Sequence, residues 1–216
     1  MPTTDRPGRS SKSAAPNPAA SRQNRRGADA GARGKLIEAT ARIMREEGYA
    51  AATSRRVAAE AGVKQALVYY YFPTMDDLFV EVLRAGAETA LTRMRALLTE
   101  DDPLRALWVM NSDSAVTTLN AEFMALANHR KAIGAELKAY AERVRDIETA
   151  AVTMVLRANQ IDLEEYPPVA ISMLIAQVAR SLCNENAVGV TQGHDELRAF
   201  VERRMRLLKA PAAPTR

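Results

Sequence analysis

Apolar residues recur every three or four positions along most of the chain, beginning at Leu36. This spacing indicates α-helices with one buried face, because successive helical side chains point about 100° apart. No segment alternates apolar and polar positions for long enough to indicate a β-strand. Helices are expected over residues 36–47, on either side of Gly62, from Thr74 onward, and over residues 104–110, 114–128, 130–159, 169–187 and 195–208. The sequence therefore predicts an all-α fold of about nine helices.

Breaks in the helical pattern divide the chain into four parts. Residues 1–33 are rich in Ser, Pro, Gly and Ala, contain no Leu, Ile, Val or Phe, and are expected to be a disordered arm. Residues 34–80 are expected to fold as a small helical domain and residues 81–210 as a larger one. Residues 211–216 are expected to be a second disordered tail.

The charge of the chain is unevenly distributed. The formal net charge is +4, and residues 1–35 carry eight Lys or Arg side chains against two Asp. A basic N-terminal part on a mildly acidic body indicates an anionic partner, of which nucleic acid is the commonest. For the arm itself, a solvated tail is favoured over a segment that contacts DNA.

The cysteine content and the hydropathy of the chain indicate the cellular compartment in which the protein is expected. Cys183 is the single cysteine, which excludes a disulfide within the chain and fits a reducing environment. No stretch approaches the roughly 18 uninterrupted apolar residues of a membrane span. We therefore expect a soluble, cytoplasmic protein without a membrane partner.

Residues 54–71 have the spacing of a helix-turn-helix. Small Ala58 lets two short helices cross closely, and Gly62 supplies the positive φ of the turn between them. Val57, Val63 and Val68 are positioned to fill the angle between the helices. The helix over residues 36–47 completes the small core.

The run GVKQALVYYYFP, residues 62–73, places four aromatic side chains in a row on the second of these helices. Such a run cannot lie on one buried face, so its side chains divide into two sets. The set expected to face inward comprises Val68, Tyr71 and Phe72. The set expected to face outward comprises Gln65, Ala66, Tyr69 and Tyr70, and it has no apolar partner in the sequence.

The outward side of this helix carries the chemistry of DNA recognition. Gln65 has the bidentate amide that suits adenine, and Lys64 can reach guanine or phosphate. Tyrosine hydroxyls can donate to phosphate, and a helix N-terminus attracts a backbone phosphate. The candidate DNA-binding residues are Thr53, Ser54, Arg55, Arg56, Lys64, Gln65, Ala66, Tyr69, Tyr70 and Tyr71. The alternative is that all of them are ordinary surface residues of a small helical domain.

Residues 35–83 resemble the DNA-binding domain of the TetR family of transcriptional regulators. The resemblance rests on Glu47-Gly48-Tyr49, Thr53, Val57-Ala58, Ala61-Gly62-Val63, Tyr69, Phe72-Pro73 and Asp77-Leu78. It implies a homodimer that binds double-stranded DNA, reads a palindromic operator with two recognition helices, and releases it when a ligand enters the larger domain. Met75 departs from the family, which usually has lysine there for a phosphate contact, and the basic arm is hypothesised to compensate.

The helix over residues 169–187 is apolar on most sides, and the last helix has an apolar stripe of its own. A helix of this kind must be covered on more than one face, so we expect one side to pack on a second copy of the chain. The resemblance implies the same dimer. The candidate interface residues are Ile171, Leu174, Ile175, Val178, Leu182, Leu197, Phe200, Val201 and Met205. The alternative is that both stripes belong to the chain's own core.

Methionine and aromatic residues on the central helices are candidates for a ligand site, because walls of this kind adapt to varied apolar ligands. The candidate ligand-binding residues are Phe79, Trp108, Met110, Phe123, Met124, Tyr140, Met154, Met173 and Asn184. Each of them also fits an ordinary core position. Because no charged residue clearly interrupts the apolar stripes, the sequence favours a mainly apolar small molecule.

The sequence does not indicate an enzyme, a metal site or a cofactor. His129 and His194 lie far apart without metal-spaced neighbours, and Cys183 lacks a basic neighbour to activate it. No glycine-rich phosphate loop is present. Two alternatives to a ligand-released repressor stay open. One is the same DNA-binding dimer acting as an activator or controlled by a protein partner, and the other is an all-α enzyme or adaptor with no specific DNA target.

Overall fold

The computed structural model describes residues 18–208, with side chains described from Gly31 onward. Residues 1–17 of the expected arm and the expected tail over residues 211–216 lie outside this range. The described residues form nine α-helices and two short 3-10 helices and contain no strand, so the predicted all-α fold is confirmed. The elements are α1 (Pro18–Glu47), η1 (Tyr49–Ala51), α2 (Ser54–Glu60), α3 (Ala66–Tyr71), α4 (Met75–Ala96), η2 (Leu97–Thr99), α5 (Pro103–Asn111), α6 (Ser114–Ala127), α7 (Lys131–Ala158), α8 (Pro168–Ala187) and α9 (His194–Arg206).

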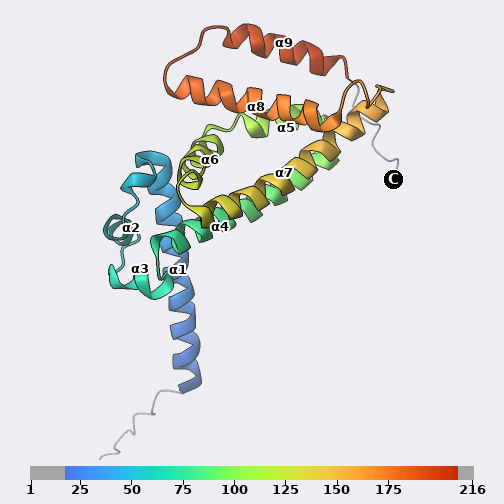
Figure 1. Ribbon diagram of the computed structural model, residues 1–216. Helices are drawn as coiled ribbons and strands as arrows, with labels where there is room; N and C mark the ends of the chain where they lie inside the picture. The colour runs from blue at the N-terminus through green and yellow to red at the C-terminus, as the bar shows by residue number, and fades with distance from the viewer. Residues whose placement is uncertain (1–17, 209–216) are drawn as a thin grey trace, which may run out of the picture.

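Helix α1 begins at Pro18, well before the position where the sequence predicts the folded part to start. Figure 1 shows its N-terminal half, in blue, extending past α3 and away from the other helices. The disordered segment expected over residues 18–33 is therefore helical. The physical reason is that Ala, Arg and Gln have high helix propensity, so this segment can extend the helix that begins the folded part.

Arg33 joins this helix to the folded domain. Its guanidinium forms an ion pair with Glu81 of α4, and its Cζ atom lies 5.3 Å from the centre of the Phe72 ring. The hydrogen bond from Arg33 is the main reason why the pKa of Glu81 is lowered. Arg33 is thus part of the small domain, although the sequence places it in the arm.

The helix-turn-helix is built from α2 and α3 as the sequence predicts. Gly62 has a φ of 66°, and the amide of Val63 donates to the carbonyl of Ala58 at 3.0 Å, which closes the turn. Val57 and Val68 are fully buried between the two helices and α1. This packing fixes the direction of α3 relative to the rest of the domain.

Helix α4 belongs to both domains. Thr74 and Asp77 form a capping box at its start, with the Thr74 amide 2.9 Å from Asp77 Oδ2 and the Asp77 amide 3.1 Å from Thr74 Oγ1. The helix then runs without a break through residue 80, where the sequence analysis places a domain boundary. Its N-terminal half packs in the core of the small domain, whereas Leu91 and Met94 pack in the core of the larger one.

The larger domain is arranged around α7, which packs along α4 and against α6 and α8. Figure 1 shows α4 with α7, α6, and α8 with α5 as three sides of a triangle. Phe123, Leu126, Ile133 and Leu137 of α6 and α7 complete the core of the small domain, so that domain is not closed by its own residues alone. No helix among residues 18–208 is both long enough and apolar enough to cross a membrane.

Helix α9 runs back in the direction opposite to α8, above it at the top of the molecule in Figure 1. It contacts the larger domain through Met205, which packs against the core of that domain, called the second core below. His194 at its N-terminus is buried, and its Nε2 atom lies 2.8 Å from Glu185 Oε2 near the end of α8. This hydrogen bond is the main cause of the lowered pKa of Glu185.

Candidate DNA-binding surface and ligand cavity

The outward side of α3 is exposed in the way that the sequence predicts. Tyr69 and Tyr70 expose 51% and 70% of their surface, which is unusual for side chains of this size, and Gln65 and Ala66 are exposed beside them. Val68 and Phe72 are buried on the opposite side, and Tyr71 is half-buried with its ring edge-on to Tyr70 at 4.9 Å between centres. The division of the aromatic run into two sets is therefore confirmed.

Ser54 connects the start of α2 to this exposed side. Gln65 Nε2 donates to Ser54 Oγ at 2.9 Å, and the Tyr69 hydroxyl donates to the same oxygen at 3.1 Å. Ser54 itself is buried, and its expected phosphate contact stays a prediction. One buried hydroxyl thus positions two exposed side chains, which lowers the entropy lost when they bind a partner.

Arg56 forms ion pairs with two carboxylates, and its side chain stays 39% exposed. Its Nη2 atom lies 2.6 Å from Glu47 Oε1 and its Nη1 atom 2.8 Å from Glu60 Oε2. The hydrogen bond to Glu47, followed by the one to Glu60, raises the pKa of Arg56. Arg56 therefore ties α2 to the end of α1, and its expected contact with DNA stays a prediction.

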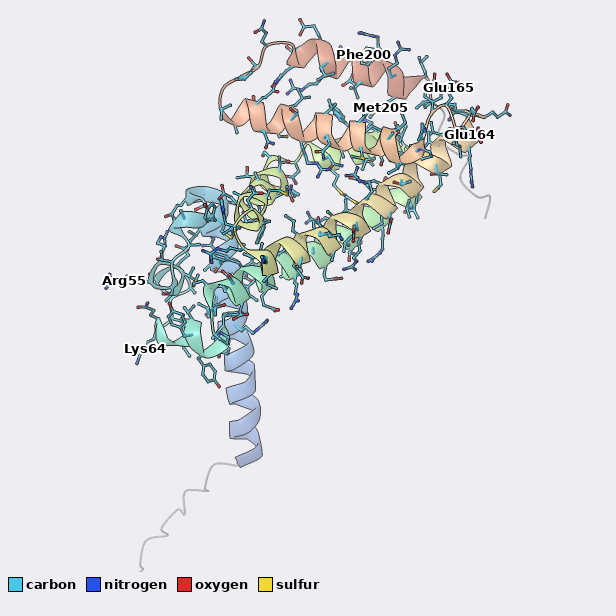
Figure 2. All side chains as sticks on the ribbon, in the orientation of Figure 1. Arg55, Lys64, Glu164, Glu165, Phe200 and Met205 are labelled. Atoms are coloured by element: carbon cyan, nitrogen blue, oxygen red, sulfur yellow. The ribbon has the colours of Figure 1, made fainter. Side chains whose placement is uncertain are left out.

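Arg55 and Lys64 are exposed and form no ion pair with another described residue. Figure 2 labels both, and their side chains extend outward from the helix-turn-helix on the side away from the larger domain. Thr53 is also exposed, and its hydroxyl accepts a hydrogen bond of 3.3 Å from the Arg56 amide as the N-cap of α2. Two uncompensated cations thus flank the exposed tyrosines.

A large cavity of about 1740 Å³ lies between α4, α5, α6, α7 and α8. Six of the residues proposed for a ligand site from the sequence line it: Trp108, Met110, Phe123, Met124, Tyr140 and Asn184. Phe79, Met154 and Met173 do not. Phe79 faces the core of the small domain, while Met154 and Met173 expose 38% and 44% of their surface away from the cavity wall. Helical periodicity alone could not distinguish these faces, because each of the three positions also fits an apolar stripe.

One wall of the cavity is charged, which the sequence analysis does not anticipate. Arg145 and Arg180 line it, and fully buried Glu148 lies between them, 3.8 Å from Arg145 Nη1 and 3.9 Å from Arg180 Nη2. Asn111 Nδ2 donates to Glu148 Oε1 at 3.2 Å. Burial raises the pKa of Glu148 and lowers the pKa of Arg180.

A signal for this wall was present in the sequence. Glu148 lies four residues after Val144 and four before Val152, and both valines are buried. A charged residue in register with an apolar stripe must be paired or functional, because an isolated buried carboxylate is very costly. Asn111 and Arg180 come from other helices, so no local pattern connects them to Glu148.

The residues proposed for a dimer interface are partly exposed. Leu174 on α8 and Phe200 on α9 expose 61% and 47% of their surface. Ile171, Ile175 and Met205 pack partly on the second core, Leu182 is buried, and Val178, Leu197 and Val201 are half-buried. Figure 2 shows Met205 on the side of α9 that faces α8. The dimer interface stays a prediction.

The described residues contain no group of three or more His, Cys, Asp or Glu side chains that could hold a metal ion. His129 is exposed in the connection between α6 and α7, and His194 is buried beside Glu185. Cys183 Sγ contacts the Ser112 carbonyl oxygen at 3.1 Å.

Comparisons with known proteins agree with these features. The model of the bacterial regulatory proteins of the tetR family matches residues 36–82, which span the end of α1, the helix-turn-helix and the start of α4. The HTH-type transcriptional regulator PksA of Bacillus subtilis is 31% identical over 108 residues, which are 46% of this chain and 53% of PksA. The chain therefore spans about half the length of this curated relative.

Solved structures of low sequence identity share the fold. A TetR transcription regulator from Haloarcula marismortui is 19% identical, with a TM-score of 0.63 over 82% of this chain and 98% of that one. The transcriptional regulator FadR of Bacillus subtilis, solved in complex with stearoyl-CoA, is 14% identical, with a TM-score of 0.55 over 71% of this chain and 88% of that one. These likenesses extend the agreement in fold from the helix-turn-helix to the larger domain.

Proposed function

Since the chain belongs to the TetR family of bacterial regulatory proteins, we propose that it is a homodimeric repressor. It binds a palindromic operator through α3 and leaves it when a small molecule enters the cavity. The observation that carries this proposal is the exposed side of α3. Its two tyrosines are too exposed to belong to the chain's own core, and uncompensated Arg55 and Lys64 lie beside them.

Duplex DNA fits this surface better than a protein partner does. The major groove admits an α-helix, and Gln65 presents an amide there that can pair with adenine. Tyr69 and Tyr70 combine a ring, which can contact sugar or a thymine methyl group, with a hydroxyl for phosphate. The positive charges of Arg55 and Lys64 match the phosphates on either side of the groove.

A second copy of the chain supplies the second half of the operator. Leu174 and Phe200 are exposed on α8 and α9, the two helices on which we propose the dimer to form. A two-fold symmetric dimer places the same surface on both subunits, and half-sites one helical turn apart require recognition helices about 34 Å apart.

Helix α4 connects the cavity to the DNA-binding surface. Val82, Leu83, Ala87 and Met94 of α4 line the cavity, and Leu83 with the preceding turns also packs in the core of the small domain. A ligand that displaces α4 therefore displaces α3 with it. The coupling needs only about 1–3 kcal/mol to change operator affinity by one to two orders of magnitude.

Helix α6 provides a second connection. Glu122 Oε2 accepts a hydrogen bond of 2.7 Å from the Tyr49 amide in η1, directly ahead of the helix-turn-helix. Phe123 beside it lines the cavity. The cavity is thus bounded by two helices that both hold the small domain.

The body of the effector is proposed to be apolar. Trp108, Met110, Phe123 and Met124 give the cavity an adaptable wall. FadR, whose fold this chain shares, was solved with the long-chain thioester stearoyl-CoA. The volume of the cavity, about 1740 Å³, accommodates a molecule larger than an ordinary drug-sized ligand.

The proposal is tested by selecting duplexes from a random pool with the purified full chain. The expected motif is an inverted repeat whose half-site centres lie about one helical turn apart. Recovery of no motif from a folded protein would contradict the proposal and favour an adaptor or enzyme without a specific DNA target.

Arg55→Ala and Lys64→Ala are each expected to weaken binding to every duplex and to flatten its dependence on salt. Each phosphate contact contributes about 0.9 to the slope of log K against log salt, so a dimer that loses one contact per subunit loses about 1.8. The measurement is the affinity for the selected duplex between 50 and 200 mM salt, a range in which such slopes are resolved. Arg95→Ala, which removes an exposed charge at the end of α4, is the matched control. An unchanged slope in both variants would show that these cations do not touch the DNA.

A further inference from the structure

The charged wall of the cavity is built from three helices. Asn111 comes from α5, Arg145 and Glu148 from α7, and Arg180 from α8, and only Glu148 is inaccessible from the cavity side. Arg145 and Arg180 each expose about a quarter of the side chain, 26% and 24%. Glu148 therefore lies behind the two arginines, whose side chains line the cavity.

The charges of this wall do not balance. Two guanidinium groups face one carboxylate, and the two ion pairs are long, at 3.8 and 3.9 Å. Arg180 Nε donates to the Ala176 carbonyl at 3.1 Å, whereas Arg145 Nη1 and Glu148 Oε2 are buried without a hydrogen-bond partner among the described residues. A buried charge without full pairing is costly, so the arrangement is incomplete as it stands.

The positive sign of the net charge on this wall determines which kind of ligand group can bind there. A cationic ligand group would meet two guanidinium groups ahead of the single carboxylate. An apolar group would remove water from both arginines and return no hydrogen bond. An anionic group with two oxygens accepts N–H donors from a guanidinium in a fork geometry and brings the wall from a net charge of +1 to zero.

We infer that the effector carries an oxygen-acid group, a carboxylate or a phosphate, that binds between Arg145 and Arg180. Its apolar body extends toward Trp108 and Phe123. Glu148 acts as a positioning residue that holds the two guanidinium groups from behind, and Asn111 holds Glu148. This inference rests on the proposed function in taking the cavity as the effector site. It replaces a wholly apolar effector by an amphipathic acid.

Trp108 provides a readout, because it is the only tryptophan in the chain and lines the cavity. The probes are decanoate, decyl phosphate and decan-1-ol, which share one alkyl chain and differ in the head group. Trp108 fluorescence is titrated with each probe on the full chain. We expect at least one of the two anions to bind 10-fold or more tightly than the alcohol. The anion that binds more tightly shows whether the site prefers a carboxylate or a phosphate. Equal affinity for all three probes, or no binding of any of them, overturns the inference.

Three variants test which residues are responsible. Arg145→Gln and Arg180→Gln are each expected to lower the affinity for the anion 10-fold or more and to leave the affinity for decan-1-ol unchanged. Glu148→Gln keeps an acceptor for Asn111 and removes the negative charge, so it is expected to bind the anion more tightly. If the three residues had only a structural role, all three variants would lower the affinity for the anion and for the alcohol alike. That result would overturn the inference. If an arginine variant does not fold, the comparison of the three head groups on the unmodified chain still tests whether the cavity prefers an acid group.

Failure of the proposed function has a different signature. If the anion binds in an arginine-dependent way but leaves the affinity for the selected duplex unchanged, the acid site is supported. The proposal of a ligand-released repressor is then contradicted. If operator binding is specific and no probe binds, the DNA-binding part stands and the acid site does not.

Discussion

The double variant Gln65→Ala/Tyr69→Ala is expected to lose about 100-fold or more in affinity for the selected duplex, as estimated from base contacts worth about 1–3 kcal/mol each. Both side chains lie on the exposed side of α3 and share the buried hydroxyl of Ser54. Removing them takes away a base-reading amide and a phosphate donor on each subunit. The dimer therefore loses two contacts of each kind.

The same variant is expected to remain folded. The two side chains are exposed, and each loses one hydrogen bond worth about 0.5–1.5 kcal/mol to stability. The expected change in Tm is therefore a few degrees. Thermal unfolding followed by circular dichroism and equilibrium binding to the selected and a scrambled duplex are the measurements.

The matched control is Gln192→Ala/Tyr166→Ala, which removes the same two residue types from exposed loops on either side of α8. It is expected to bind the selected duplex as the unmodified chain does. If the α3 variant also binds with unchanged affinity while folded, the exposed side of α3 does not contact DNA, and an adaptor role for that surface becomes the better account.

The double variant Leu174→Asp/Phe200→Asp is expected to be monomeric and to lose about 100-fold or more in operator affinity. Both side chains are exposed apolar groups on the two helices proposed for the dimer, and a charge placed in their contact would be buried without a partner. A monomer reaches only one half-site, so it loses the effective concentration that links the two, which is worth about 100-fold to 10,000-fold.

Sedimentation equilibrium gives the mass of the variant, and the same duplex gives its affinity. Ala139→Asp at an exposed position of α7 is the control, since it adds a charge of the same sign outside α8 and α9. A variant that stays dimeric would place the interface elsewhere. A monomeric unmodified chain that still bound the inverted repeat tightly would remove the need for a dimer.

The helix-turn-helix could be derived from the sequence because its determinants are local. Gly62 in the turn, the Thr74–Asp77 capping box and the spacing of Val57 and Val68 each act within a few residues, and all of them are found in the structure. The exposure of Tyr69 follows from the same periodicity. Where each side chain points was thus predictable, whereas the hydrogen bonds to Ser54 required the crossing angle of α2 and α3.

The cavity and its charged wall could be derived only in part. Trp108 and Phe123 were found because apolar side chains at helical spacing must face some interior. The role of Glu148 could not be derived, since its partners Asn111 and Arg180 lie 37 residues before it and 32 after it in the chain, and only the packing of α5, α7 and α8 brings them together. The helical start of α1 was missed for another reason, because a segment without apolar residues gives no periodic signal.

Repeating the duplex selection with Gln65→Ala tests the central claim most directly, namely that α3 reads base edges in the major groove. The account predicts that the variant loses the preference at one base-pair position, symmetrically in both half-sites. The other positions and the half-site spacing should stay as they are in the motif selected by the unmodified chain. An identical motif, with the same preference at every position, would contradict the account.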